Sequence, residues 1–158
     1  MARTGIGFDS HRLVEGRRLI IGGVEIGYEK GLDGHSDADV LCHAVIDALL
    51  GAVAAGDIGS HFSDRDPQWK GADSLMLLEK VVRMLSDRGW RVINIDSCIV
   101  AEAPVMAPYI SAMRGKLAEI LDVDMSAVSV KAKTGEGMGF EGRGEGISAM
   151  ATVLVGEI

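Results

Sequence analysis

One segment, Ala38 to Ala55, constrains the fold more than any other part of the chain. Most of its positions are Val, Leu, Ile or Ala, whereas Asp39, His43 and Asp47 recur every four residues. This spacing predicts a helix that is apolar around most of its circumference and carries one polar stripe. Burying a carboxylate or an imidazole is costly unless the group is paired or bound to a metal ion. The stripe therefore predicts a polar or metal site inside the fold, unless it faces water.

A second set of metal-ligating side chains lies near the N-terminus, in Asp9-Ser10-His11. In an extended segment residues i and i+2 point the same way, so Asp9 and His11 can converge on one ion. His43 would be the third ligand. Two imidazoles and one carboxylate suit zinc, and three protein ligands leave a position open for substrate or water, as is typical of catalytic sites. Asp47, one turn beyond His43, is expected to accept a hydrogen bond from that imidazole and fix its tautomer.

The remaining apolar patterns predict an alternation of strands and helices. The segments with strand character are Arg3–Phe8, a hairpin over Leu19–Ile26 with its turn at Gly22-Gly23, Trp90–Val100, Ala127–Ala132 and Ile147–Val155. The helices are the first one, capped by Ser36 or Asp37, a second from Asp73 to Gly89, and a third over Pro108–Leu121. This order is α+β. We expect helices to cover one face of a sheet and self-association to bury the other.

Length and charge limit the function classes. A chain of 158 residues predicts a single domain over residues 1–158 with enough apolar content for a core. A net charge of −7 and scattered Lys and Arg argue against a nucleic-acid partner. No apolar run is long enough to cross a membrane. Cys42 and Cys98 have no CxxC spacing, and no secretory leader precedes them, so we expect reduced thiols in a cytoplasmic protein.

A glycine-rich stretch, Lys133 to Gly146, contains six glycines. Backbone N–H groups at such density can turn toward phosphate oxygens, while Thr134 adds a hydroxyl and Glu136 a hard oxygen suited to magnesium or manganese. A flexible hairpin loop is an equally good interpretation.

Two further loops carry weaker signals. Gly56–Gly59 together with Phe62–Pro67 bears carboxylates that can hold a polyol, although solvated turn residues also explain it. Ala101–Pro108 offers little side-chain chemistry and could bind a ligand only through backbone groups.

Six blocks of sequence, taken in order, carry a family resemblance. They are Gly7-Phe8-Asp9-x-His11-Arg12, Gly34-His35-Ser36-Asp37-x-Asp39-Val40, Asp47 to Ala52, Gly56-Asp57-Ile58-Gly59, Lys70 to Ser74, and Gly142-Arg143-Gly144-Glu145-Gly146. The chain resembles the 2-C-methyl-D-erythritol 2,4-cyclodiphosphate synthase family over essentially its whole length.

The resemblance implies a homotrimer with active sites at the subunit interfaces, in which Asp9, His11 and His43 hold zinc and Glu136 holds a second divalent ion, magnesium or manganese. It implies a phosphorus-oxygen lyase of the non-mevalonate isoprenoid pathway. In that reaction the 2-phosphate of 4-diphosphocytidyl-2-C-methyl-D-erythritol 2-phosphate attacks the β-phosphorus, giving the cyclic diphosphate and CMP.

The resemblance also implies residue roles. His35 and Thr134 would stabilise the transition state, and Phe140 and Arg143 would line a cavity on the trimer axis that accepts an isoprenoid diphosphate, although a structural role for Arg143 is equally consistent. The implied substrate-contacting residues are Asp9, His11, His35, Ser36, Asp57, Ile58, Gly59, Phe62, Ser63, Asp64, Arg65, Asp66, Ala101, Glu102, Ala103, Pro104, Val105, Met106, Ala107, Lys133, Thr134, Gly135, Glu136, Phe140 and Arg143.

The chain departs from that pattern at two places. Lys133-Thr134-Gly135 stands where some members have a run of threonines, and Val105 stands where some have a lysine. Two rival functions remain at this point: a zinc phosphohydrolase that uses metal-bound hydroxide and gives a linear product, and a non-catalytic trimer that binds isoprenoid diphosphates. An intact set of metal ligands argues against the second.

Overall fold

The computed structural model describes all 158 residues and has mixed α+β architecture, as predicted. The strands are β1 (Ala2–Glu15), β2 (Leu19–Ile21), β3 (Val24–Ile26), β4 (Lys30–Leu32), β5 (Trp90–Val100), β6 (Val128–Lys133) and β7 (Gly146–Glu157). The helices are α1 (Val40–Ala52), α2 (Ile58–His61), α3 (Ser74–Asp87), α4 (Ile110–Leu121) and α5 (Gly139–Gly142). No helix has both the length and the apolar character needed to cross a membrane.

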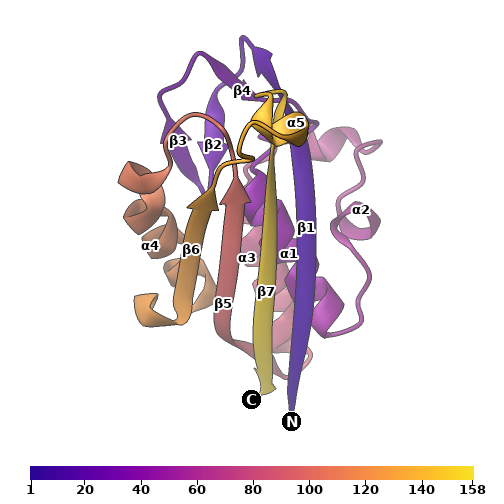
Figure 1. Cartoon of the computed structure of the whole chain (residues 1–158). Coiled ribbons are helices and arrows are strands. Elements are labelled where there is room, and N and C mark those ends of the chain that lie inside the picture. Colours follow the sequence, from indigo (N-terminus) through magenta and orange to yellow (C-terminus); the bar gives the residue numbers. More distant parts are fainter.

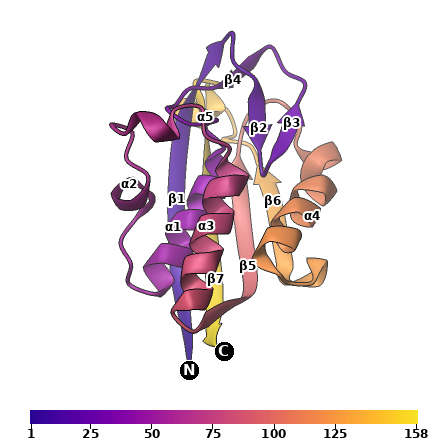
Figure 2. The ribbon, with the colours of Figure 1, turned by 180° about the vertical axis from the view of Figure 1, so that it is seen from behind.

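A five-stranded sheet in the order β4-β1-β7-β5-β6 organises the chain, and β2 and β3 form a separate hairpin. β1 pairs antiparallel with β7 from Ala2↔Gly156 to Arg12↔Gly146, β7 pairs antiparallel with β5, and β6 joins β5 in parallel. The helices α1, α3 and α4 lie behind the sheet in Figure 1 and in front of it in Figure 2. Helices therefore flank one face of the sheet, as expected.

Helix α1 lies unusually close to strand β1. A Cβ atom added at Gly5 would come within 1.9 Å of the Ala48 carbonyl oxygen, and one at Gly7 would come within 1.9 Å of the Ala44 carbonyl oxygen. Only glycine permits this approach, because any larger residue would push the helix away from the strand. The contact brings the polar side of α1 next to Asp9 and His11 on the same face of β1.

The N-terminus of α1 is capped by Asp39, which corrects the prediction that Ser36 or Asp37 caps it. The fully buried Asp39 carboxylate accepts hydrogen bonds from the backbone N–H groups of Cys42 (3.1 Å), Gly22 (2.8 Å) and Gly23 (2.7 Å). The first residue of the polar stripe therefore ties the β2–β3 turn to the start of α1.

Other boundaries differ from the predictions for local reasons. The strand expected over Arg3–Phe8 continues to Glu15 because β7 pairs with it as far as Arg12 and β4 pairs with it beyond that point, so Asp9 and His11 lie inside the strand. The elements β4, α2 and α5 were not predicted; they have three, four and four residues, which is too short for a clear apolar period. The bounds of β2, β3 and β5 agree with the predictions.

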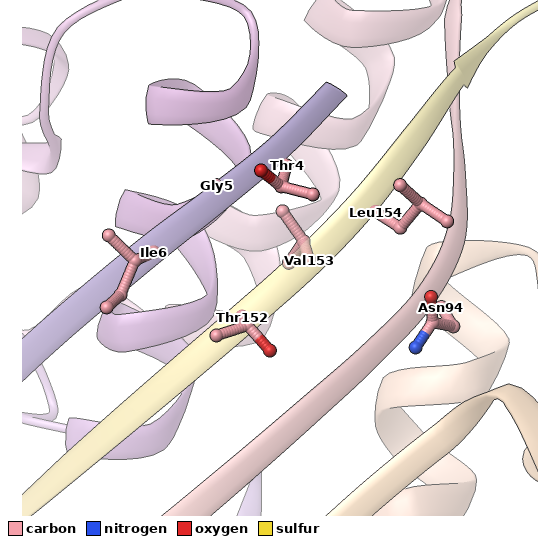
Figure 3. A pocket seen from close by; sticks show the side chains of 7 residues that line it. All are labelled: Thr4, Gly5, Ile6, Asn94, Thr152, Val153 and Leu154. Atoms are coloured by element: carbon pink, nitrogen blue, oxygen red, sulfur yellow. The ribbon is translucent and has the colours of Figure 1, made fainter. Parts of the chain in front are cut away.

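The second face of the sheet is covered by none of the long helices and carries exposed apolar side chains. Ile6 is 69% exposed, Phe8 55% and Met150 48%. A hollow of about 440 Å³ lies on this face, where Thr4, Ile6, Thr152, Leu154 and Asn94 stand out from β1, β7 and β5 (Figure 3). Contiguous exposed apolar surface of this kind is typical of an interaction face.

The Asp39 network predicts a large difference between two capping residues. Asp39→Ala leaves three backbone N–H groups without an acceptor, two of them in the β2–β3 turn, which Asp39 links to α1. The substitution should lower the free energy of unfolding by about 3 kcal/mol. Asp73→Ala removes the exposed cap of α3, which accepts one bond from Leu75 N–H, and should cost about 1 kcal/mol. Urea unfolding at one protein concentration, with chelator present, would measure both. Equal losses would contradict the buried network.

Candidate metal centre

Three ligands, Asp9, His11 and His43, meet between β1 and α1. One carboxylate oxygen of Asp9, Oδ2, lies 2.8 Å from His11 Nε2 and 3.1 Å from His43 Nδ1, and these two ring nitrogens lie 3.2 Å apart. The three residues form a group whose ligand atoms all lie within 4.8 Å of one another. The predicted convergence is therefore present, since Asp9 and His11 share a face of β1 and the close packing of α1 brings in His43.

Each imidazole is oriented by a hydrogen bond at its other nitrogen. His11 Nδ1 lies 2.8 Å from the Asp33 carbonyl oxygen, so Nδ1–H donates there and Nε2 is left as the ligand. His43 Nε2 lies 2.9 Å from Ser74 Oγ, whose hydroxyl donates to Asp37. Because Ser74 donates to Asp37, it accepts from His43 Nε2–H, and Nδ1 of His43 faces the site.

This arrangement corrects the role predicted for Asp47. Its carboxylate accepts a hydrogen bond from Ile58 N–H at 2.8 Å and so holds the start of α2. Ser74, held by Asp37, accepts the hydrogen bond from His43 that was expected to go to Asp47. No local sequence pattern indicates the hydrogen bond between Ser74 and Asp37, because the two residues are 37 positions apart.

The charges of the centre are coupled. Burial alone would raise the pKa of Asp9, but hydrogen bonds from His11 and His43 outweigh it and lower that pKa from 3.8 to about 2. Burial also opposes the protonated form of His11, but the hydrogen bond and charge of Asp9 raise its pKa above 6.5. A cation is therefore favoured between these groups, and a divalent ion would displace the His11 proton.

The centre opens into a cavity of about 280 Å³. Its lining residues are Asp9, His11, Gly34, His35, Ser36, His43, Ile58, Gly59, Phe62, Asp64, Trp69 and Leu77. Phe62 and Trp69 pack edge to face, with ring centroids 5.0 Å apart, and form an apolar wall. Nine of these residues were predicted to bind metal or substrate, whereas Gly34, Trp69 and Leu77 were missed. An apolar Trp or Leu in sequence gives no sign that it faces a cavity rather than the core.

Four residues predicted for the same loop do not line this cavity. Asp57 caps α2 by accepting from Ser60 N–H at 2.8 Å, and Asp66 accepts from Gln68 N–H at 3.0 Å. Ser63 Oγ accepts from Arg65 N–H at 3.2 Å. Within one chain these polar groups shape the loop, while Ile58, Gly59, Phe62 and Asp64 face the cavity.

The remaining predicted substrate residues gather elsewhere, beyond the carboxyl ends of β5 and β6. Glu102 accepts a hydrogen bond from Gly135 N–H at 3.0 Å, which joins the Ala101–Ala107 loop to the glycine-rich loop. Thr134 Oγ1 accepts from the N–H of Glu136, whose φ of 53° is left-handed. Strands β7 and β5 separate this cluster from β1; three strand intervals amount to roughly 14 Å. One chain does not bring Thr134 and Glu136 to the metal ligands.

Phe140 and Arg143 lie near a third feature at the end of β1. Phe140 lines a cavity of about 200 Å³ together with Ser10, Arg12 and Glu145 on the open face of the sheet. The exposed Arg143 pairs with Glu145, Nε to Oε1 at 2.8 Å.

Comparison with known proteins settles the family. The model of the YgbB family matches residues 2–156. The chain belongs to the YgbB family. Alkaliphilus metalliredigens has a family relative named 2-C-methyl-D-erythritol 2,4-cyclodiphosphate synthase, which is 61% identical over 155 residues and 98% of each chain.

Solved structures agree. The bifunctional IspDF from Campylobacter jejuni matches with a TM-score of 0.96 and 40% identity over all of this chain and 43% of its own. A 2C-methyl-D-erythritol-2,4-cyclodiphosphate synthase in its CDP-bound form matches with a TM-score of 0.90 and 34% identity, over 98% of this chain and all of its own. The helix-flanked sheet is therefore the fold of this family.

The donor set fits a divalent transition metal, since it supplies two oriented imidazoles and one carboxylate. Protein purified without chelator should carry about one such ion per chain, measured by elemental analysis. His43→Ala should lose it. Asp47→Asn should keep it, because Asp47 contacts Ile58 rather than His43, and so should His61→Ala, whose ring bonds to the Ala55 carbonyl. Metal retained in His43→Ala, or lost in Asp47→Asn, would refute the assignment.

Proposed function

We propose that this chain converts 4-diphosphocytidyl-2-C-methyl-D-erythritol 2-phosphate to 2-C-methyl-D-erythritol 2,4-cyclodiphosphate and CMP, as a phosphorus-oxygen lyase of the non-mevalonate isoprenoid pathway. An oxygen of the 2-phosphate forms a bond to the β-phosphorus, and the bond from that phosphorus to the CMP oxygen breaks. The single observation that carries the proposal is the Asp9, His11 and His43 centre opening into a cavity, in a family whose relatives bear this name.

The residues of the chain would bind and orient the substrate. Asp9, His11 and His43 would hold zinc, which when bound neutralises charge on phosphate oxygens. His35, at the cavity wall, would contact the transferring phosphoryl group through Nδ1, because its Nε2–H donates to the Asp66 carbonyl oxygen at 3.1 Å. Phe62 and Trp69 would exclude water, while Ile58, Gly59 and Asp64 would contact the erythritol part.

No side chain is needed as a nucleophile. The two serines near the metal ligands, Ser36 and Ser74, are both engaged with His43 Nε2. Cys42 is fully buried, and desolvation raises the pKa of its thiol, which suppresses the thiolate. An intramolecular reaction whose two ends are held in line needs chiefly positioning and charge neutralisation.

The shared site is the second part of the proposal. The apolar open face of the sheet would pack against its copies in a homotrimer, and the Thr134–Glu136 loop of one subunit would reach the metal centre of the next. Glu136 would hold magnesium or manganese, Thr134 and Lys133 would contact the diphosphate, and Ala101–Ala107 would contact cytosine through backbone groups. The CDP bound by a structural relative supports a nucleotide site.

The axial cavity and the cellular location remain part of the same proposal. Phe140 and Arg143 would line a cavity on the trimer axis that accepts an isoprenoid diphosphate. The pathway assignment and the absence of a CxxC pair support a cytoplasmic enzyme with reduced thiols.

Product analysis tests the reaction. With the cytidine-diphosphate substrate, phosphorus NMR should show a cyclic diphosphate and CMP, and Cys42→Ala and Cys98→Ala should turn over at wild-type rates. A linear diphosphate or free orthophosphate would instead favour a zinc phosphohydrolase.

Mixed assemblies test the shared site. His43→Ala and Glu136→Ala should each be inactive alone. In a randomly mixed population of trimers, head-to-tail interfaces would pair an intact triad with an intact Glu136 at roughly a quarter of the sites, and at roughly a third in the trimers that contain both variants, so activity should return. Co-expression with two different tags, isolation of doubly tagged trimers and comparison of turnover with each parent would measure it. Inactive mixed trimers that still carry zinc would mean that each site is built within one chain.

A further inference from the structure

One wall of the metal centre is residues 33–36, the first part of the loop that joins β4 to α1. The Asp33 carbonyl oxygen holds His11 Nδ1 at 2.8 Å, and Ser36 Oγ lies 3.2 Å from His43 Nε2. Gly34, His35 and Ser36 also line the cavity. The position of this short loop therefore affects both imidazole ligands and the residue proposed to contact the phosphoryl group.

A single side chain, Arg17, holds that loop from outside. Its Nε donates to the Leu32 carbonyl oxygen at 3.0 Å, Nη1 to that of Gly34 at 3.2 Å, and Nη2 to that of Ser36 at 3.0 Å. β4 is an edge strand, so carbonyls on its outer side have no strand partner. The planar guanidinium, with five N–H donors in a rigid fork, can satisfy three alternate carbonyls at once.

The intervening residues are held from other elements. The N–H of Asp33 donates to the Arg12 carbonyl oxygen of β1 at 2.8 Å. The carbonyl oxygen of Asp33 accepts from His11, which also belongs to β1. The His35 carbonyl accepts from Gly71 N–H at 2.8 Å. Arg17 therefore hydrogen-bonds to the carbonyls of residues 32, 34 and 36, whereas residues 33 and 35 bond to β1 and to the segment before α3.

Arg17 does not line the cavity and takes part in none of the salt bridges of the chain. Its guanidinium is committed to the loop carbonyls. We infer that Arg17 is a positioning residue that sets the orientation of His11, His43 and His35 through the backbone of residues 32–36. The effect on metal binding stands on the geometry alone, whereas the effect on turnover rests on the proposed function.

Three variants distinguish the effect of the Arg17 guanidinium's hydrogen-bonding geometry from the effect of its positive charge and from a general loss of stability. Arg17→Ala removes the three bonds, Arg17→Lys keeps the charge but not the fork, and Arg18→Ala is the matched control. Arg18 is the next residue in the chain, but its guanidinium bonds to the exposed carboxylate of Glu25, at 2.7 and 2.8 Å, and makes no contact with the loop.

The first measurement is metal binding, independent of any substrate. Zinc affinity would be measured by competition with a chromophoric chelator, and the visible absorption of the Co²⁺-loaded protein would report ligand geometry. Residues that orient metal ligands from outside change affinity by about 10–100-fold when removed. Arg17→Ala and Arg17→Lys should both weaken zinc binding about tenfold or more and shift the Co²⁺ spectrum, whereas Arg18→Ala should match the wild type.

The second measurement is rescue and turnover. Millimolar guanidinium should restore the zinc affinity and Co²⁺ spectrum of Arg17→Ala, while potassium chloride at the same ionic strength should not. At saturating zinc, kcat of Arg17→Ala should remain at least tenfold below that of the wild type, because His35 is displaced, and guanidinium should raise it.

Wild-type zinc affinity, Co²⁺ spectrum and kcat in both Arg17 variants would overturn the inference, even if their thermal stability fell. If Arg17→Ala does not fold, Arg17→Lys alone tests the inference. Wild-type zinc affinity, Co²⁺ spectrum and kcat in that variant would show that the guanidinium's three hydrogen bonds are unnecessary. If the wild type yields no cyclic product, the proposed function fails, while the zinc and Co²⁺ measurements still decide the role of Arg17.

Discussion

The contact of α1 with β1 through Gly5 and Gly7 is the constraint on which the site depends. The helix sits so near the strand that a single methyl group at either glycine would collide with a helix carbonyl. This proximity lets His43 reach the carboxylate of Asp9 and the ring of His11 without a long or flexible side chain. The same packing buries most of α1, so the polar residues on it must all be satisfied, and Asp39, His43 and Asp47 each take a different partner.

The geometry of the metal centre depends on the groups that hydrogen-bond to the two imidazoles as much as on the three ligands themselves. A backbone carbonyl fixes one ring, and a buried serine that donates to a half-buried aspartate fixes the other. The two histidines present different nitrogens to the site, Nε2 from His11 and Nδ1 from His43. Rigid outer contacts of this kind hold ligands in place before an ion arrives, which is a condition for a small site to bind tightly.

The sequence predicted those features that follow from local chemistry. The pair Asp9 and His11 follows from strand alternation, and the bounds of β5 follow from a strong apolar pattern. The role expected of Asp47 was wrong because its carboxylate instead accepts a hydrogen bond from the N–H of Ile58, a residue outside α1 whose position no helical spacing predicts. The contact of His43 with Ser74 could not be predicted, since Ser74 begins α3 and its own partner Asp37 lies in the loop before α1, and only the completed fold brings them together. The roles of Thr134, Glu136 and the Ala101–Ala107 loop stay predictions, because they depend on a neighbouring subunit.

The strand order has a consequence for how the chain is made. β7 lies between β1 and β5, yet it is the last strand to leave the ribosome. Until it emerges, β1 has no central partner, and the surface onto which α1 packs is incomplete (Figure 1). The sheet can therefore be completed only after β7 has been synthesised, and until then the most apolar helix lacks part of the surface on which it packs.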